Sequence, residues 1–176
     1  MYEYRPIRAE ELQFVYRRIE AENLFWCLDC EYQKPDFREW MQKFLRKDVL
    51  MVGGFVDGDF AGVLMAHGIS QRSRCAEIGV CGFHKYFGEA DALARGAMLY
   101  LFDNYDCTSA LGRIAVPNLH ALRMLDAVGF SRVARVKDMF WYERKGKYVD
   151  GIIVYADAAS VESACTAEER YPSIAQ

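Results

Sequence analysis

The sequence predicts a single α/β domain in which a mixed, partly antiparallel sheet is covered by helices on both faces. Two observations lead there: segments of strand and helix periodicity alternate, and a tight hairpin turn lies near the middle of the chain. The chain has 176 residues, of which 52% are hydrophobic and 27% charged. A domain of this size buries about two thirds of its unfolded surface and needs no disulfides or metals to fold.

The first half of the chain is predicted to contain a short strand, two amphipathic helices and three longer strands. Apolar residues recur at helical spacing in both helices, and Pro35 precedes the second one. Asp57-Gly58-Asp59 is typical of a hairpin turn, because Gly58 readily adopts a positive φ. The expected elements span residues 2–8, 9–22, 36–47, 49–56, 60–69 and 75–83.

The second half is predicted to alternate between helices and strands and to end in a surface tail. Asn118 suits a helix cap, and Gly129 suits the end of that helix. Residues 157–176 are small and polar, so we expect residues 1–156 to form one domain and 157–176 a tail. The expected elements span residues 89–105, 110–116, 118–128, 130–142 and 148–156.

Charge and hydropathy exclude several classes of protein. The net charge is −3, and the expected tail carries all of it, so residues 1–156 are balanced. A balanced body argues against a nucleic-acid binder. No apolar run reaches the roughly 18 residues of a membrane span, and the N-terminus does not resemble a signal peptide. Cys27 and Cys30 form a lone C-x-x-C, and without a second pair it favours reduced thiols over a metal site.

One segment resembles a known family. Val116-Pro117-Asn118, the helix that follows and the closing Gly129-Phe130 resemble the GNAT superfamily of acetyl-CoA-dependent N-acetyltransferases, and the element order agrees over residues 2–156. The resemblance is nearest to the branch that acetylates protein N-termini and to short phage and prophage members. It implies the GNAT fold, with a mostly antiparallel central sheet flanked by helices. It also implies a cytoplasmic enzyme, compatible with a homodimer, that acetylates a primary amine of a protein N-terminus or small molecule.

The resemblance implies a site for the pyrophosphate of acetyl-CoA between the third long strand and the next helix. The family motif there is Arg/Gln-x-x-Gly-x-Gly/Ala, whose small residues let backbone N–H groups approach phosphate. One register uses Lys85, Gly88 and Ala90, and a second uses Phe87, Ala90 and Ala92. In the first register the implied cofactor-binding residues are Val80, Lys85, Gly88, Glu89, Ala90 and Asn118. Glu89 and Asp91 put two carboxylates beside the phosphates in either register.

The resemblance also implies catalytic groups. Glu77 corresponds to a strand glutamate that serves as general base in several branches; the alternative is an ion pair with Arg72 or Arg74. The family's tyrosine acid is replaced by Leu125, which leaves His120 and Tyr142 as substitutes. The segment between the first two helices, including Phe25, Trp26, Tyr32 and Lys34, is expected to shape the acceptor site. The competing interpretation is a GNAT-fold binding protein that has lost catalysis.

Overall fold

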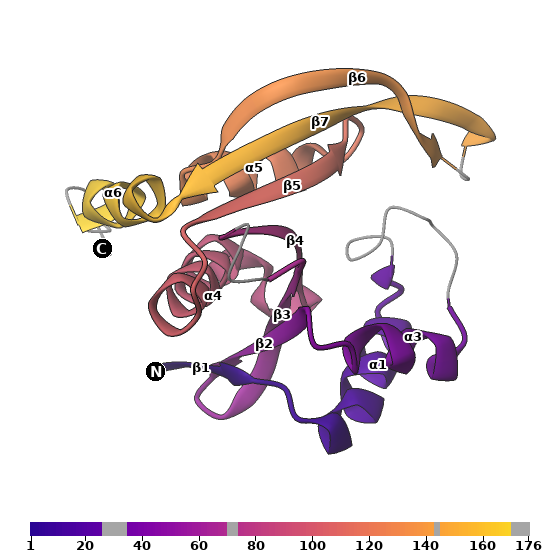
Figure 1. Ribbon diagram of the computed structural model, residues 1–176, viewed down its shortest axis with the longest axis vertical. Helices are drawn as coiled ribbons and strands as arrows, with labels where there is room; N and C mark the ends of the chain where they lie inside the picture. The colour runs from indigo at the N-terminus through magenta and orange to yellow at the C-terminus, as the bar shows by residue number, and fades with distance from the viewer. Residues whose placement is uncertain (26–34, 70–73, 143–144, 170–176) are drawn as a thin grey trace.

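The computed structural model describes residues 1–25, 35–69, 74–142 and 145–169. Its strands form a seven-stranded sheet in the order β1-β2-β3-β4-β5-β7-β6, shown in Figure 1. Neighbouring strands are antiparallel except for β4 and β5. The strands are β1 (Tyr2–Pro6), β2 (Val49–Val56), β3 (Asp59–His67), β4 (Cys75–Gly82), β5 (Ser109–Ala115), β6 (Ser131–Tyr142) and β7 (Lys147–Asp157).

Helices cover both faces of this mixed, mostly antiparallel sheet, as the sequence predicts. Alternate residues of a strand point to opposite faces, so Met65 packs with α1 and α3 while Leu64 packs with α4. No described helix is both long and apolar enough to cross a membrane. The helices are η1 (Ala9–Glu11), α1 (Leu12–Ala21), α3 (Phe37–Phe44), η2 (His84–Glu89), α4 (Ala90–Asn104), α5 (Leu119–Val128) and α6 (Ala158–Glu169).

Several local signals read from the sequence are confirmed. Asp57 and Gly58 both have positive φ, 50° and 83°, as a two-residue hairpin of the predicted kind requires. Asn118 caps α5, with its side chain accepting a hydrogen bond from the backbone N of Ala121 at 3.2 Å. Gly129 ends α5 in the left-handed conformation, at φ 99°. These features depend on neighbours in the sequence, which is why they could be predicted.

The end of the chain differs from the predicted surface tail. Residues 158–169 form α6, which begins at a cap in which Asp157 accepts hydrogen bonds from the backbone N of Ser160 at 2.8 Å and from its hydroxyl at 2.7 Å. Val161 is fully buried in the core beside α4 and α5. A Cβ on Gly129 would lie 2.5 Å from the carbonyl oxygen of Ser160, so α6 packs closely against the end of α5. The absence of a Cβ on Gly129 permits this close packing of a segment that was expected to lie in solvent.

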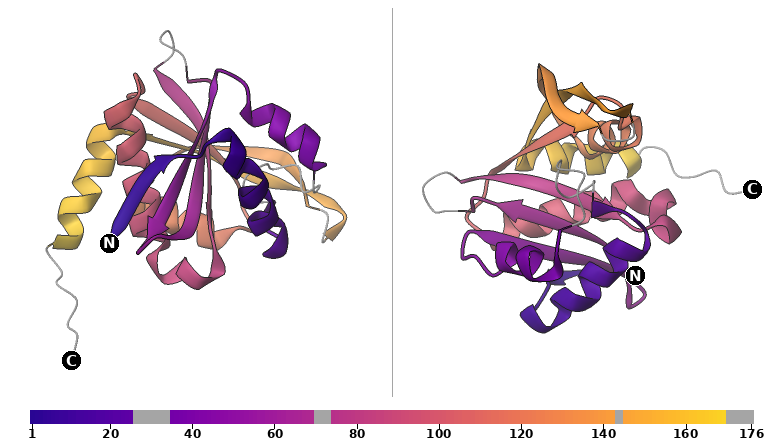
Figure 2. Two further views of the ribbon diagram at one scale, coloured as in Figure 1. Left: turned by 90° about the horizontal axis from the view of Figure 1, so that it is seen from below. Right: turned by 90° about the vertical axis from the view of Figure 1, so that its right-hand side faces the viewer.

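The two halves of the sheet separate between β4 and β5. These strands are paired only from Cys75 to Glu77 on β4 and from Ser109 to Leu111 on β5. Beyond this short ladder β4 pairs only with β3, and β5 only with β7, among the described residues. Figure 1 shows β5, β7 and β6 fanning away from β1–β4, and the two views of Figure 2 agree. Beyond the ladder, β4 therefore keeps its pairing with β3, while its opposite edge is no longer paired with β5 and borders the opening.

Candidate active site

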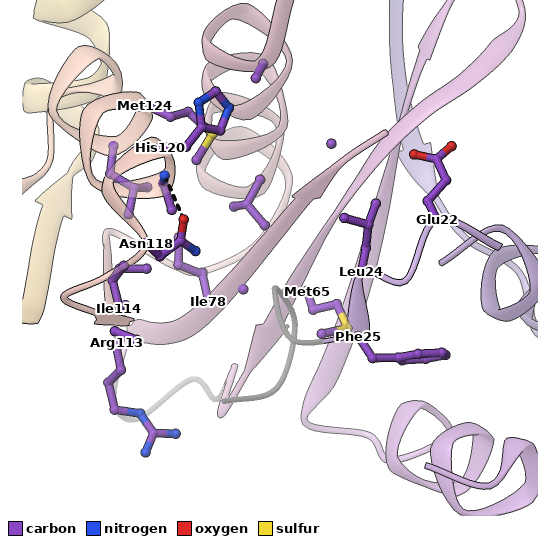
Figure 3. Close-up of a pocket in the computed structure, with 18 of the residues that line it drawn as sticks. Glu22, Leu24, Phe25, Met65, Ile78, Arg113, Ile114, Asn118, His120 and Met124 are labelled. Atoms are coloured by element: carbon purple, nitrogen blue, oxygen red, sulfur yellow. Dashed lines mark hydrogen bonds between the residues drawn. The ribbon is translucent and has the colours of Figure 1, made fainter. Parts of the chain in front are cut away.

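A cavity of about 670 Å³ lies where β4 and β5 diverge. Figure 3 shows Asn118, His120 and Met124 on one side of it and Leu24, Phe25 and Met65 on the other. It is lined by residues of β3, β4 and β5, of η2 with the start of α4, and of α3 and α5. We call the part near η2 and α5 the α4 end, defined by Val80, Phe87, Ala90 and Asn118. The α3 end is defined by Phe25, Trp40, Phe44 and Met65.

At the α4 end, the residues of the predicted phosphate loop that face the cavity are mostly not those named by the first register of the motif. His84, Phe87 and Ala90 line the cavity. Phe87 lies between two imidazoles, with its ring centroid 4.8 Å from that of His84 and 5.4 Å from that of His120. The second register contributes Phe87 and Ala90 to the lining, whereas the first contributes only Ala90.

Three of the predicted cofactor-binding residues do not line the cavity. Lys85 Nζ lies 2.8 Å from a carboxylate oxygen of Asp59. Glu89 accepts a hydrogen bond of 2.7 Å from the hydroxyl of Tyr2. A Cβ on Gly88 would meet no atom within 4 Å, so this glycine faces open space. Lys85 and Glu89 are thus held by β3 and β1, through contacts between residues far apart in the sequence.

The ion pair between Lys85 and Asp59 shifts the pKa values of both side chains. Hydrogen bonds from Lys85 and then from the Tyr86 hydroxyl lower the pKa of Asp59 to about 2, and the hydrogen bond to Asp59 raises the pKa of Lys85. The Tyr86 hydroxyl lies 2.6 Å from the same carboxylate oxygen. Lys85 therefore stabilises the packing of η2 on β3, which accounts for its position outside the cavity.

The start of α4 continues directly from η2, and the backbone N–H of Ala90 donates to the carbonyl of Phe87. The N-cap residue of α4, Glu89, makes no side-chain capping bond, so the N–H groups that follow Ala90 are not satisfied by a side-chain cap. Ala90, the first residue of α4, lines the cavity and has no side chain large enough to block it. Val80 lines it from β4. Asn118 also lines the cavity while capping α5, so the two predicted roles of this residue are compatible.

Glu77 lies in the cavity wall but pairs with a different arginine from the two considered in the sequence. Nε of Arg113 lies 2.6 Å from Oε1 of Glu77. Arg74 instead bonds Asp106 at 2.8 Å, and Arg72 is outside the described residues. The parallel ladder places Glu77 beside Leu111, and Arg113 lies two residues further on the same face of β5. The partner depends on which strand neighbours β4, which local sequence patterns do not reveal.

The α3 end is built from large apolar side chains. Phe25, Trp40 and Met65 are buried, and the rings of Trp40 and Phe44 are 4.5 Å apart. Phe25 was expected near the acceptor; Trp26, Tyr32 and Lys34, also expected there, lie outside the described residues. Trp40, Phe44 and Met65 were missed as lining residues. Their only sequence signal is the apolar face of an amphipathic helix or strand, which equally describes core packing.

Of the remaining residues considered for proton transfer, some line the cavity and one does not. Leu125 lines the cavity where the family has its tyrosine, and His120 lines it nearby. Tyr142 is not among the lining residues, and its ring lies 5.9 Å from Nζ of Lys145. Within the described ranges no group of three or more His, Cys, Asp or Glu residues could hold a metal ion. Cys27 and Cys30 lie outside those ranges.

Neither protein-family profiles nor curated protein sequences match this chain, but solved structures do. The spermidine N-acetyltransferase of Vibrio cholerae, in complex with CoA and spermine, superposes with a TM-score of 0.76 at 18% identity, covering 92% of this chain and 98% of that one. A dodecameric structure of the Vibrio cholerae enzyme in an intermediate state gives 0.71 at 16% identity, covering 90% and 94%. A chimera of spermidine N-acetyltransferase from Vibrio cholerae and hSSAT gives a TM-score of 0.74 at 17% identity, covering 92% of this chain and 98% of that one.

These likenesses establish the fold. At 16–18% identity the chain shares the architecture of the acetyltransferases over nearly its whole length. The predicted GNAT fold is therefore confirmed.

Proposed function

We propose that this chain transfers an acetyl group from acetyl-CoA to the primary amine of a small molecule. The observation that carries the proposal is the cavity between β4 and β5, which opens beside an α4 N-terminus without a side-chain cap. The structural neighbours support it, because one is a spermidine N-acetyltransferase in complex with CoA and spermine. A protein N-terminus as acceptor, a phage origin and a homodimer stay predictions from the sequence.

Two features of the cavity fit acetyl-CoA. The backbone N–H groups at the start of α4 can bind its pyrophosphate, since they carry the positive end of the helix dipole and Ala90 allows close approach. Val80 lies beyond the end of the described ladder with β5, so its backbone groups can hydrogen-bond an extended amide chain. We assign the phosphate contact to the N–H groups that follow Ala90 in the first turn of α4, with Phe87 beside them, and the chain contact to Val80. Lys85, Gly88 and Glu89 stay predictions with no support from the lining.

The chemistry requires the acceptor nitrogen to attack as a free amine. When bound, acetyl-CoA supplies a thioester whose C–S bond breaks as the new N–C bond forms. Glu77 is the proposed group that takes the amine proton, directly or through water. Leu125 provides no proton, so the leaving thiolate is protonated by solvent or by His120. A thiol of ordinary pKa, about 8.5, is a tolerable leaving group without a dedicated acid.

The test has two separate readouts. Calorimetric titration with acetyl-CoA should show a dissociation constant in the micromolar range, about −8 kcal/mol. A thiol-specific reagent should then detect coenzyme A release only when a primary amine is added. Failure of millimolar acetyl-CoA to produce heat or raise the melting temperature would rule out the proposal.

A second candidate function is a GNAT-fold protein that binds without catalysis. The specific observation is that the Glu77 carboxylate is bound by Arg113 while Leu125 replaces the acid. The proposed base is therefore held in an ion pair, and the residue in place of the acid cannot donate a proton. This candidate predicts acetyl-CoA binding with no amine-dependent thiol release at any pH between 6 and 9.5, so the same assay separates the two.

A further inference from the structure

The α3 end of the cavity shows which class of amine it accepts. Its wall combines buried aromatic rings with a methionine, and these side chains come from three separate elements. The ring of Tyr16 lies 5.0 Å from that of Phe25 and 5.5 Å from that of Trp40, so a third aromatic side chain holds both in place. This is a preorganised apolar surface, which binds a flat apolar group with little loss of side-chain entropy.

The described carboxylates of the cavity wall are already neutralised. Glu77 pairs with Arg113 at 2.6 Å. Glu22 accepts hydrogen bonds from the backbone N of His84 at 2.7 Å and lies 3.1 Å from its Nδ1. The same carboxylate lies 3.3 Å from Nε of Arg18, and its side chain is only 15% exposed. Each acid therefore already interacts with a basic side chain of the chain itself.

Among the described lining residues the charges are balanced as well. Two glutamates, Glu22 and Glu77, and two basic residues, Lys43 and Arg113, give these residues no net charge when the histidines are neutral. A polyamine carries several ammonium groups, and each one that leaves water needs a carboxylate that is not neutralised already. A monoamine carries a single ammonium group, which loses its proton to the proposed base Glu77 before the attack, so no further positive charge needs a carboxylate.

We infer that the acceptor is a primary monoamine with an aromatic-sized apolar body. The apolar body rests on Phe25, Trp40 and Phe44, and the amine points from there toward β4. This inference rests on the proposed function, because it names the acceptor for the same cavity. Such an acceptor differs from spermine, with which one structural neighbour was solved in complex.

The test compares two amines by direct binding. 2-Phenylethylamine and spermidine are titrated calorimetrically into the protein at about 0.15 M salt, where nonspecific attraction between exposed charges is screened. Each titration is run on the free protein and on the protein saturated with coenzyme A. We expect 2-phenylethylamine to bind at least tenfold more tightly than spermidine in both. Equal or tighter binding of spermidine, or no binding of 2-phenylethylamine, would overturn the inference.

A pair of variants locates the binding surface. Phe44→Ala should weaken 2-phenylethylamine about tenfold, since it removes one ring of the surface. Phe14→Ala is the matched control: Phe14 is an exposed phenylalanine on α1 outside the cavity lining. Equal effects of both variants would contradict the assignment. If coenzyme A does not bind but 2-phenylethylamine is still preferred, the proposed function alone is refuted. If coenzyme A binds and spermidine is preferred, only the acceptor class is refuted.

Discussion

The two ends of the cavity are built in different ways. The α4 end consists of backbone groups and small residues, with Ala90 at the first turn of α4 and Val80 on the part of β4 that leaves the ladder. The α3 end consists of large side chains, with Trp40 and Met65 almost fully buried. One end can recognise a ligand through N–H groups that every non-proline residue carries, and the other only through the residues that happen to stand there.

This difference explains why the sequence was informative at one end and ambiguous at the other. The proposed phosphate site consists of backbone groups, which constrain the side chains only by size. It is therefore compatible with Phe87 at the position where the family motif has arginine or glutamine, and with nearby carboxylates that point elsewhere. Glu89 does so by bonding Tyr2. The α3 end has no comparable rule, and its specificity follows from the shape and charge of individual side chains.

The largest effect is expected from removing the proposed general base, Glu77. Glu77→Gln should lower turnover about 100-fold at pH 7, because a positioned general base is removed. Affinity for acetyl-CoA should stay unchanged, and the loss should shrink above pH 9, where the free amine is already deprotonated. The measurement is a pH–rate profile of both proteins with one accepted amine.

Glu39→Gln serves as the control for Glu77→Gln, since Glu39 is an exposed acid on α3 outside the lining. Normal turnover of the Glu77 variant at neutral pH would exclude this carboxylate as the base. The bond from Arg113 would then be its main role, and positioning of the thioester would account for catalysis.

A somewhat smaller effect tests the α4 end. Ala90→Glu should weaken acetyl-CoA binding about 30-fold, about 2 kcal/mol, because it places a carboxylate where the phosphates bind. Gly88→Glu adds the same charge two residues earlier, facing open space, and should change the affinity less than about threefold. Calorimetry gives both affinities, and melting temperatures show whether each variant is folded. A larger loss for Gly88→Glu would favour the first motif register over the second.

The smallest effect separates the chemistry of the site from the stability of the domain. The side-chain hydrogen bond from Arg5 lowers the pKa of Glu11 from 4.5 to about 2. A carboxylate with a depressed folded-state pKa stabilises the fold above its unfolded pKa, and that contribution is lost as the pH falls from about 4.5 to about 2. Glu11→Gln should therefore remove about 1 kcal/mol of unfolding free energy at pH 7, after allowance for solvent screening, and nearly nothing below pH 2.

Urea unfolding at a series of pH values measures this difference for Glu11→Gln. Glu10→Gln, one residue earlier and more exposed, is the control. A constant difference across the acid range would show that the loss at Glu11 comes from packing rather than from ionisation.

Much of the fold could be predicted because its signals are local. The hairpin at Asp57-Gly58, the cap at Asn118 and the end of α5 at Gly129 each depend on residues within one turn of chain. Apolar periodicity likewise located the strands and most helices to within a few residues. The helix after residue 157 was missed, although Asp157 and Ser160 carry a cap pattern, because Val161 shows its burial only once Gly129 lies against it.

The sequence by itself determined which residues form strands, turns and helix ends, since those depend on backbone preferences and on near neighbours. The resemblance to the acetyltransferase family also pointed to Glu77, Val80, Ala90 and Asn118, which line the cavity. Only the tertiary structure decided that Arg113 neutralises Glu77, 36 residues away, and that Asp59 holds Lys85, 26 residues away. Ion pairs of this kind depend on which strands and helices become neighbours, and long-range packing, rather than local preference, sets that order.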